Sequence, residues 1–480
     1  MPPFITSYGG GLDPATGAYA LSARLQSIMV SIINVGEFIG AVSSFLVGDH
    51  LGRKGSFLIA MACVVVGTIL QLAHVSLGEL LVGRLILGYA VGLISCVVPL
   101  YIADCAPPHL RGALVSMYQF CVGQGLLLGV IVDNGTHNRT DSGSYRIPMA
   151  VQLIFPLIVV PGLLTFVPES PRWLLSKFKG DKARSALARL HGNRPEIIEG
   201  EVAIIKGSIE ADEATGRSSW REIFRWGPEG RKAYLGMALQ ALQQATGINF
   251  ITGYGIVFFF QIGFKTAFLI QIGLYLIANP ALWISQYLTD KLGRRTVIMI
   301  SGVLTAAVLF VVGGCGLATD KGRSIEKLIV AMVYLFLVFF NLGWGPTVWV
   351  VTSEISTGKN RNKLMALSTG TNWLFNWLVS FTFPYLFDTT AANLGPKIGF
   401  LYGSLTLAAT AWVYWFLPET AGRTLEEIHY MFEQGVPARE FKSTVIEQPT
   451  SMTLEDQKIA QAQVEEDIGV PQMHGQLGLA

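Results

Sequence analysis

The sequence is poor in charged residues. Asp, Glu, Lys and Arg make up only 14% of its 480 residues, whereas ordinary soluble domains carry roughly 25%. Apolar residues make up 51% and gather in long runs instead of amphipathic stripes, which predicts a polytopic membrane protein. The formal net charge of +2 excludes the strong charge imbalance expected of a protein that binds nucleic acid or an acidic partner.

Cysteine is also scarce. The few cysteines lie in or beside apolar runs and lack the spacing of metal ligands. We therefore interpret them as small buried residues and expect no disulfide, no metal and no cofactor. The N-terminal stretch has neither a charged start nor an apolar core, so no signal peptide is predicted. The cysteines are Cys63, Cys96, Cys105, Cys121 and Cys315.

Long apolar runs mark the expected spanning helices. A helix needs about 20 mostly apolar residues to cross a bilayer, and eleven segments meet this rule. They predict an all-α polytopic membrane protein. The segments are 25–47, 56–77, 80–102, 113–132, 147–167, 234–260, 267–288, 296–317, 327–351, 365–387 and 398–417.

The basic residues predict the orientation. Segment 172–232, between the fifth and sixth spans, carries thirteen Lys and Arg residues, so we expect it to be cytoplasmic and helical in pieces. Alternation then places residues 1–24 outside and the C-terminal tail, residues 421–480, inside. The tail ends in an acidic, Gln-rich stretch, 455–476, that we expect to be disordered. The short loops carry similar numbers of basic residues on both sides and do not decide the orientation.

Three short motifs occur twice, in the same order, and the copies are separated by 241, 250 and 250 positions. Such matched pairs indicate a duplicated half. The chain is therefore predicted to hold two related helix bundles, residues 25–171 with five spans and residues 233–420 with six. The repeated pairs are 48–54 with 290–295, 104–111 with 354–361, and 168–170 with 418–420.

Acidic and basic residues of these motifs are predicted at one face of the membrane. Salt bridges there can close the inner mouth of a transport path in one state and part in the other. The alternative is an ordinary excess of basic residues at a cytoplasmic boundary, but the repetition of matched acid–base pairs favours a gate. The candidates are Asp49, Arg53, Lys54, Asp104, Arg111, Glu169, Asp290, Arg294, Arg295, Glu354, Arg361, Glu419 and Arg423.

Two ionisable residues lie well inside apolar spans. Glu37 falls midway along the first span, and Arg84 lies about one turn into the third. Charges inside a membrane are costly and usually mark transport paths or proton relays, so both are candidates for proton coupling. The alternative for Arg84 is snorkelling to the outer surface. For Glu37 it is a protonated carboxyl group bonded to a neighbouring helix.

Amide and indole side chains form a second polar set within the spans. Amides donate and accept hydrogen bonds and indoles stack on C–H faces, so this set suits a neutral polyhydroxyl ligand. An anionic substrate would need a buried Arg or Lys, which the spans of the second half lack. The alternative is hydrogen bonding between helices. The set comprises Gln119, Gln243, Gln244, Asn249, Asn279, Asn341, Asn372 and Asn376, with Trp349, Trp373 and Trp377.

Two sequons, Asn134-Gly135-Thr136 and Asn138-Arg139-Thr140, fall in a loop that the expected topology places outside. Both asparagines are therefore possible glycosylation sites. Their closeness to a helix end leaves a glycosylating enzyme little room.

Together these motifs resemble the sugar porter family of the major facilitator superfamily, over residues 25–428. The stretch 138–148 is similar to filamentous-fungal members. Besides the first charged motif, the likeness is carried by Gly83-Arg84…Gly88…Gly92, Ala106-Pro107…Arg111-Gly112, Pro168-Glu169-Ser170-Pro171-Arg172-Trp173, Gln243-Gln244-Ala245-Thr246-Gly247-Ile248-Asn249, Gly345-Pro346…Trp349 and Pro418-Glu419-Thr420…Gly422-Arg423-Thr424.

The resemblance implies a major facilitator fold of two pseudo-symmetric bundles that rock about a midplane site. It also implies that Arg84 would partner an acid on the first helix of proton-coupled members. The family has twelve spans, and Met1-Pro2-Pro3-Phe4 resembles the outer end of the first one, so we expect that span to be missing. The resemblance places Gln119, Gln243, Gln244, Asn249, Trp349, Asn372, Trp373 and Asn376 around the sugar.

The sequence thus predicts a transporter of a hexose-like monosaccharide, with proton symport in the full-length form. Alternatives are a facilitative uniporter, a porter of quinate, a disaccharide or a polyol, and a nutrient sensor built on the same fold. We expect no enzymatic activity. The expected partners are a small sugar, protons and the lipid bilayer, for a monomer in the plasma membrane with a cytoplasmic C-terminus.

Overall fold

The computed structural model describes residues 2–8, 22–73, 76–106, 111–191, 194–214, 216, 218–261, 264, 266–318, 322–387, 392 and 394–444. These residues form helices joined by turns and bends, and none of them is in a strand. The all-α prediction is therefore confirmed for the described part of the chain. Residues 1–442 form one compact unit and residues 443–480 a second. The acidic stretch 455–476 lies outside the described residues.

The helices follow the expected order. The first half and the segment after it contain α1 (Pro2–Tyr8), α2 (Ala23–Ala73), α3 (Leu77–Cys105), α4 (Arg111–Thr136), α5 (Gly143–Val151), α6 (Ile154–Thr165), α7 (Pro171–Ser176), α8 (Gly180–His191), α9 (Pro195–Ala214) and α10 (Trp220–Phe224). The second half contains α11 (Pro228–Ala245), α12 (Ile248–Gln261), α13 (Ala267–Ala278), α14 (Pro280–Leu292), α15 (Arg294–Cys315), α16 (Arg323–Leu342), α17 (Pro346–Ile355), α18 (Arg361–Phe387), the 3₁₀ turn η1 (Gly395–Lys397), α19 (Ile398–Phe416) and α20 (Leu425–Glu433).

Seven helices in the described ranges are long and apolar enough to cross a membrane, which supports an integral membrane protein. The longest has 50 residues and would extend about 75 Å, which is more than twice the ~30 Å of a hydrocarbon core. It covers two expected spans. The expected spans 234–260, 365–387 and 398–417 fall on α11–α12, α18 and α19, outside this set, so the count of eleven stays a prediction. The seven are 24–73, 77–105, 113–136, 143–165, 267–292, 294–315 and 323–355.

The continuity of several helices differs from the expected spans. Spans 25–47 and 56–77 join in α2 across a kink at Gly52, which lies between them and has a φ of 77°. The span expected at 234–260 is broken between α11 and α12 at Gly247, with φ 83°, and Pro280 separates α13 from α14 because proline cannot donate the helical hydrogen bond. Such broken helices are typical of the substrate path of a transporter.

Glycines let α2 and α3 approach closely. A Cβ atom added to Gly88 would lie 2.0 Å from the carbonyl oxygen of Ile33, and one added to Gly92 would lie 2.0 Å from that of Glu37. Neither position can therefore hold a larger residue without moving the backbone. This close contact fixes Glu37 against the neighbouring helix.

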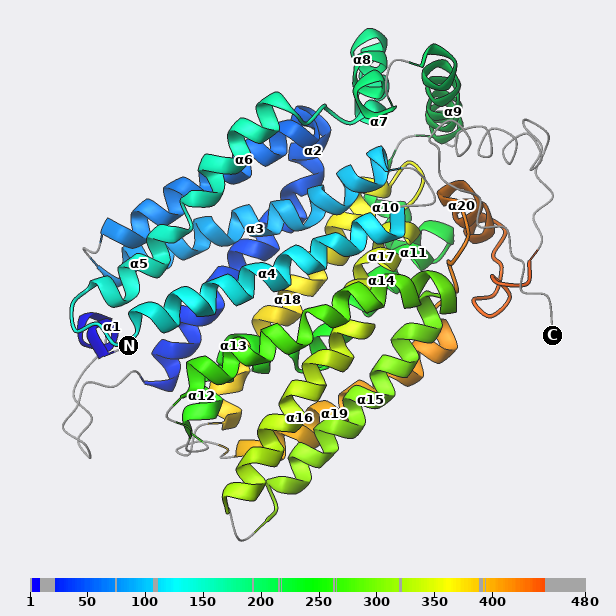
Figure 1. Cartoon of the computed structure of the whole chain (residues 1–480). Coiled ribbons are helices and arrows are strands. Elements are labelled where there is room, and N and C mark those ends of the chain that lie inside the picture. The colour runs from blue at the N-terminus through cyan, green and yellow to red at the C-terminus, as the bar shows by residue number, and fades with distance from the viewer. Residues whose placement is uncertain are drawn as a thin grey trace, which may run out of the picture. The chain divides into compact units, whose positions relative to one another are not determined.

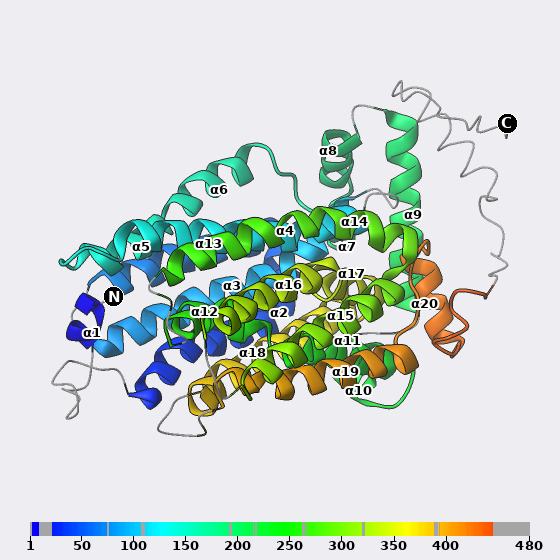
Figure 2. The same cartoon turned by 60° about the horizontal axis from the view of Figure 1, so that its bottom comes forward.

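The two halves lie side by side along the bundle. In the first half α4 runs alongside α13 and α14 of the second half (Figure 2), and α18 packs against α2 and α3. Helices α7 to α10 and α20 stand together at one end, which we call the charged end, and α1 lies at the opposite end (Figure 1). There α1 packs on α5, with the rings of Phe4 and Tyr145 5.5 Å apart. The charged end is where the repeated motifs meet.

Candidate functional site

A glutamate caps the helix that follows the kink in the first half. The Glu169 carboxylate accepts hydrogen bonds from the backbone N–H groups of Arg53 at 2.8 Å and Lys54 at 3.1 Å. It occupies the space beside Gly52, where an added Cβ would lie 2.4 Å from a carboxylate oxygen. The negative charge faces the free N–H groups at the helix start. Glycine is therefore needed at position 52 for two reasons: it adopts the positive φ, and it leaves space for the Glu169 carboxylate.

The second half repeats this cap. The Glu419 carboxylate accepts from the backbone N–H groups of Arg294 at 2.8 Å and Arg295 at 3.1 Å. A Cβ added to Gly293, whose φ is 92°, would lie 2.4 Å from a Glu419 oxygen. The duplicated motifs therefore form the same three-dimensional arrangement twice.

A second acid in each half binds the arginine side chain. In the first half Asp104 lies 3.3 Å from Arg53 and accepts a hydrogen bond from Ser170. In the second half, Glu354 takes the place of Asp104 and lies 3.1 Å from Arg294. It accepts a hydrogen bond from Thr420. Each arginine therefore has its backbone held by one glutamate and its guanidinium by another acid.

The two halves are joined at the charged end by side chains of α18. Arg361 lies 2.8 Å from Asp104, and both side chains are at least nine-tenths buried. Beside this pair Asn362 accepts from Arg53 at 3.0 Å and donates to Asp49. These contacts hold α2 and α3 against α18, so this end of the molecule is closed. The pseudo-symmetric partner of Arg361 is Arg111, whose side chain lies outside the described residues.

Four candidate gate residues differ from the expected side-chain salt bridges. Glu169 and Glu419 bind backbone N–H groups. Lys54 donates to the carbonyl oxygens of Leu164 and Val167 and so caps the C-terminus of α6. Arg295 donates to the carbonyl oxygen of Tyr414 at the end of α19. These groups satisfy free backbone groups at helix ends, which a count of charges in the sequence cannot reveal.

The two remaining candidates make local contacts. Asp290 pairs with Arg294 at 3.1 Å, one turn away on the chain and half exposed. Arg423 donates to the carbonyl oxygen of Phe441 at 3.1 Å, which ties the segment after α20 to the bundle.

An amide cluster in the second half lies at the helix breaks. Asn372 of α18 donates to the side-chain oxygens of Gln240 at 2.6 Å and Gln243 at 2.9 Å. Gln243 in turn donates to the backbone oxygens of Trp344 and Gly345, between α16 and α17. The carbonyl groups freed by the break are thus satisfied by an amide instead of water.

A second chain of amides crosses between the halves. Asn249 donates to Gln244 at 2.7 Å, Asn376 to Asn249 at 3.3 Å, and Asn34 of α2 to Asn376 at 2.9 Å. No member of either chain is charged. Because each amide binds another amide, both donors and acceptors are available for a hydroxyl-rich ligand that replaces these bonds.

Two tryptophans of the predicted set contact the first half. Trp373 donates to the hydroxyl oxygen of Ser95 on α3 at 3.0 Å. Trp349 packs edge-on against Tyr118 of α4, with ring centroids 5.1 Å apart. Both contacts connect the second half to the first. Among the described residues, no hydrogen bond joins the Gln119 amide to the two amide chains.

Three polar residues of this region escaped the sequence interpretation. Gln240 and Asn34 each lie one helical turn before a residue that we had selected, Gln243 and Glu37 respectively. Residues three apart share a helix face, so this spacing could have revealed them. Ser95 is a common residue in membrane helices and carries no such signal.

Two other amides of the predicted set bond to neighbouring helices. Asn279 donates to the carbonyl oxygen of Gly123 at 3.2 Å and so links α4 to the second half. Asn341 donates to the carbonyl oxygen of Ala278 at 3.0 Å, just before the break at Pro280. The contacts of Asn279 and Asn341 are therefore hydrogen bonds between helices, which was the alternative to sugar binding in the sequence analysis.

The intramembrane charges lie apart from any ion pair in the described ranges. Glu37 is 6% exposed, and its Oε2 atom has no hydrogen-bond partner there. Arg84 donates to the backbone oxygen of Met29 on α2. A buried carboxylate without a cation is costly, so a neutral, protonated Glu37 fits this site.

The sequon asparagines differ in accessibility. Asn134 is partly buried in the last turn of α4, and Asn138 is exposed in the turn that follows. Glycosylation of either stays a prediction.

In sequence the chain matches known transporters and a sensor. The family described as "Sugar (and other) transporter" matches residues 5–432. The transporter ecdD of Aspergillus rugulosus is 36% identical over 92% of this chain and 84% of its own length. The high glucose sensor RGT2 of Saccharomyces cerevisiae is also 36% identical, over 85% of this chain but only 55% of its own length. The probable glucose transporter rco-3 of Neurospora crassa is 32% identical over 90% of this chain and 75% of its own length.

In fold the chain is similar to the proton:xylose symporter XylE of E. coli. With 6-bromo-6-deoxy-D-glucose bound, XylE matches with a TM-score of 0.78 at 28% identity, over 90% of this chain and 93% of that chain. The inward-open form of XylE matches with a lower TM-score of 0.69 at 27% identity, over 90% and 94% of the two chains.

Proposed function

Because the chain belongs to the sugar porter family of the major facilitator superfamily, we propose that it carries a hexose-like monosaccharide across a membrane by alternating access. The observation that carries this proposal is the chain of uncharged amides that connects Asn34 of the first half to Asn376 and Asn249 of the second. A sugar bound there would contact both halves at once. Its arrival and release would therefore depend on their relative movement.

The chemistry of the site supports a neutral, hydroxyl-rich substrate. The amides supply paired donors and acceptors, and Trp349 and Trp373 supply apolar surfaces beside them. The roles in sugar binding that we propose for Gln119, Gln243, Gln244, Asn249, Trp349, Asn372, Trp373 and Asn376 follow from this chemistry and from the family motifs.

The gate at the charged end would open when Arg361 leaves Asp104. Because this pair joins the two halves, its separation accompanies any movement of one bundle away from the other at this end. The caps formed by Glu169 and Glu419 lie within single halves. They would keep the arginines in place while the contact between the halves breaks.

Proton coupling is proposed for Glu37, with Arg84 as a second candidate. Glu37 is buried on the α2–α3 contact, without a cation among the described residues, and such a group can carry a proton. We further propose eleven spans, two bundles at 25–171 and 233–420 joined by a cytoplasmic segment at 172–232, and a monomer in the plasma membrane with its C-terminus in the cytoplasm.

Uptake of radiolabelled hexoses into cells that lack their own sugar transporters tests the proposal. We expect saturable uptake, and Asn376→Ala should raise the half-saturating sugar concentration about tenfold because a hydrogen-bonding amide is lost. Thr382→Ala, on the same helix but outside the amide chains, is the matched control and should leave uptake unchanged. Absence of uptake by correctly inserted protein, for every hexose tested, would overturn the transporter proposal.

A sugar sensor is the second candidate, because one relative of 36% identity is a glucose sensor. A sensor would change the expression of sugar-regulated genes in the same cells without moving sugar. Uptake with quinate, a disaccharide or a polyol as competitor separates the remaining substrate classes, and uptake with and without a proton gradient separates symport from uniport.

A further inference from the structure

An apolar cluster lies between the amide chains and the charged end. Its three most buried side chains are at most 5% exposed, and a partly buried tyrosine packs against them. Two of the four residues come from the first half, on α3 and α4, and two from the second half, on α17 and α18. We call this cluster the apolar layer. Its members are Leu100, Tyr118, Trp349 and Met365.

Positions along the helices of the second half locate the layer. On α18, Met365 follows Arg361 by about one helical turn and precedes Asn372 by about two. Arg361 belongs to the charged end and Asn372 to the amide cluster. On α17, Trp349 lies between one and two turns before Glu354, the acid of the charged end in this half. The layer is therefore about one turn deeper in the bundle than the ion pairs.

The first half has the same order on α3. Leu100 precedes Asp104, the acid of the charged end, by about one turn. It follows Ser95, which accepts the hydrogen bond of Trp373, by between one and two turns. The helices of both halves thus pass from charged residues, through the apolar layer, to the residues proposed around the sugar.

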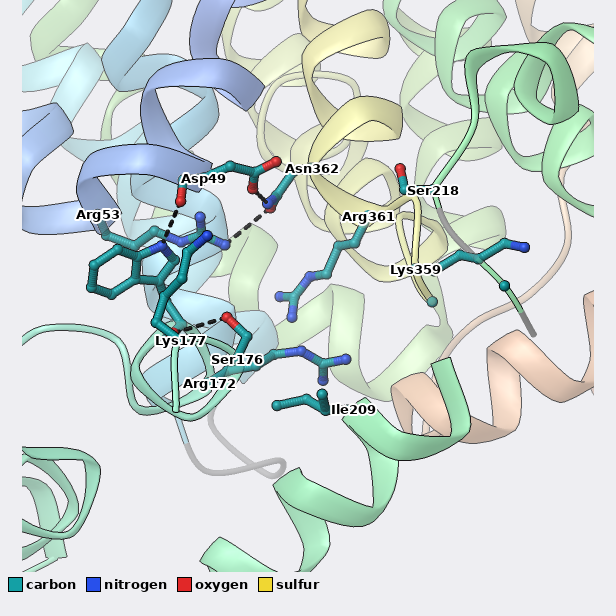
Figure 3. A pocket seen from close by; sticks show the side chains of 13 residues that line it. Asp49, Arg53, Arg172, Ser176, Lys177, Ile209, Ser218, Lys359, Arg361 and Asn362 are labelled. Atoms are coloured by element: carbon teal, nitrogen blue, oxygen red, sulfur yellow. Dashed lines mark hydrogen bonds between the residues drawn. The ribbon is translucent and has the colours of Figure 1, made fainter. Parts of the chain in front are cut away.

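Polar groups flank the layer on both sides. On the charged side, a cavity of about 540 Å³ is lined by Arg53, Arg361 and Asn362 among others (Figure 3). On the other side, Asn249 and Asn376 of the amide chains are partly exposed. Water has polar partners at both of these places, and the apolar layer lies between them.

We propose that the apolar layer is a seal, which keeps water, protons and sugar from passing between the amide chains and the charged end while that end is closed. Apart from the Tyr118 hydroxyl and the Trp349 N–H group, its side chains offer no hydrogen bond. A hydroxyl group or a water molecule that enters such surroundings unpaired is disfavoured. Close packing of buried side chains also leaves few voids as large as a water molecule.

The layer would seal the path in one state only. Leu100 and Tyr118 belong to the first half. Trp349 and Met365 belong to the second. Movement of one half away from the other at this end would therefore divide the layer and open the seal together with the proposed gate pair. This role rests on the proposed alternating access.

The seal also bears on proton coupling. Glu37 packs against Gly92 of α3, where an added Cβ would lie 2.0 Å from the carbonyl oxygen of Glu37. Gly92 lies about two turns from Leu100, on the side of the amide chains. A proton bound to Glu37 would therefore stay on that side until the halves move. Coupled transport requires this, because a path that is always open to protons dissipates the gradient.

Proton leak through the purified full chain in liposomes tests the seal. A pH step is imposed without sugar, and a pH-sensitive dye inside the liposomes reports how fast the internal pH follows. Met365→Gln keeps the length of the side chain and adds an amide that binds water, so the leak should rise about tenfold. Met365→Leu keeps the site apolar at similar volume and should leave the leak unchanged.

The matched control is Met61→Gln. Met61 is 7% exposed and packs in a cluster formed by residues of the first half alone, so the same substitution there should leave the leak unchanged. Leu100→Asn tests the seal independently from the first half and should also raise the leak. Its control is Leu93→Asn, on the same helix but in the cluster of Met61.

The comparison is made on protein that elutes as a single peak, and either pair of variants decides by itself. An unchanged leak in the layer variant, or an equal rise in the layer variant and its control, would overturn the seal. Because the leak is measured without sugar, absence of sugar transport and absence of a seal are separate results.

Discussion

Replacing Asp104 with asparagine should open the charged end of the molecule. Asp104 is the acid that receives Arg361 from the other half at 2.8 Å and Arg53 from its own half at 3.3 Å. The substitution keeps the size of the side chain and removes its charge. Of these two Asp104 contacts, only that with Arg361 crosses between the halves, so its loss is what shifts the balance between the closed and open states.

The size of the effect follows from burial. The Asp104 side chain has no exposed surface and that of Arg361 is 8% exposed, so solvent screens the pair little. A hydrogen bond to a charged group contributes about 1.5–3 kcal/mol, and losing about 2 kcal/mol shifts a two-state equilibrium roughly 30-fold. An open state populated at about 1% would then rise to roughly a quarter of the molecules.

Spin labels at equivalent positions of the two halves can measure this change. Leu51 and Leu292 occupy the same place in the repeated motif, and both are half exposed at the charged end. In a background without the native cysteines, a labelled Leu51→Cys, Leu292→Cys protein should show one main distance, and adding Asp104→Asn should introduce a longer one.

Asp290→Asn is the matched control for this measurement. Asp290 pairs with Arg294 within the second half and is half exposed, so its loss should leave the distance distribution unchanged. An unchanged distribution in Asp104→Asn, or an equal change in both variants, would refute the reasoning.

Three further predictions follow from single contacts. Gly293→Ala should lower the free energy of unfolding by about 1–3 kcal/mol, because Gly293 has a positive φ and a Glu419 oxygen would lie 2.4 Å from the new Cβ. Gly314→Ala is the control, since the space around Gly314 is open, and it should leave the free energy of unfolding unchanged. Equal unfolding midpoints for the two variants would contradict the prediction. Glu37→Gln should abolish accumulation of sugar against a gradient but keep sugar exchange, and unchanged accumulation would rule out Glu37 as the proton carrier. Burial, and then the nearby Lys232 ammonium, lower the pKa of His429 from 6.5 to about 4, although Glu229 and Glu426 oppose this. Because the unfolded chain binds the extra proton between these two values, the free energy of unfolding should fall as the pH drops from about 6.5 to about 4. In thermal unfolding at several pH values, His429→Gln should flatten that dependence.

The repeated motifs made the closed end partly predictable. Their matched order located Gly52 with Gly293 and Asp104 with Glu354, because equivalent folds place equivalent residues alike. The sequence could not tell that Glu169 and Glu419 bind backbone N–H groups, because every helix start offers such donors and none is marked in the sequence. A rule based on opposite charges therefore predicted that these glutamates form salt bridges with basic side chains.

The amide site was predicted in part, most directly where amides stand close together along the chain. Gln243, Gln244 and Asn249 stand close together in sequence, whereas Asn34 is a single amide in an apolar run and meets Asn376 only through packing of α2 on α18. The breaks at Gly247 and before Pro280 also escaped the count of spans, because a hydropathy rule measures how apolar a segment is and not whether its backbone continues.

The repeated cap and acid pair bear on the origin of the molecule. The same arrangement in both halves is what duplication of one ancestral gene would leave, if that gene already encoded it. Arg361 corresponds to Arg111 in the repeat, so the pair that now joins the halves corresponds to a contact between two copies of one smaller protein. The ancestor would then have been a homodimer that closed on itself through two identical ion pairs, and gene fusion later allowed the two ends of each pair to diverge.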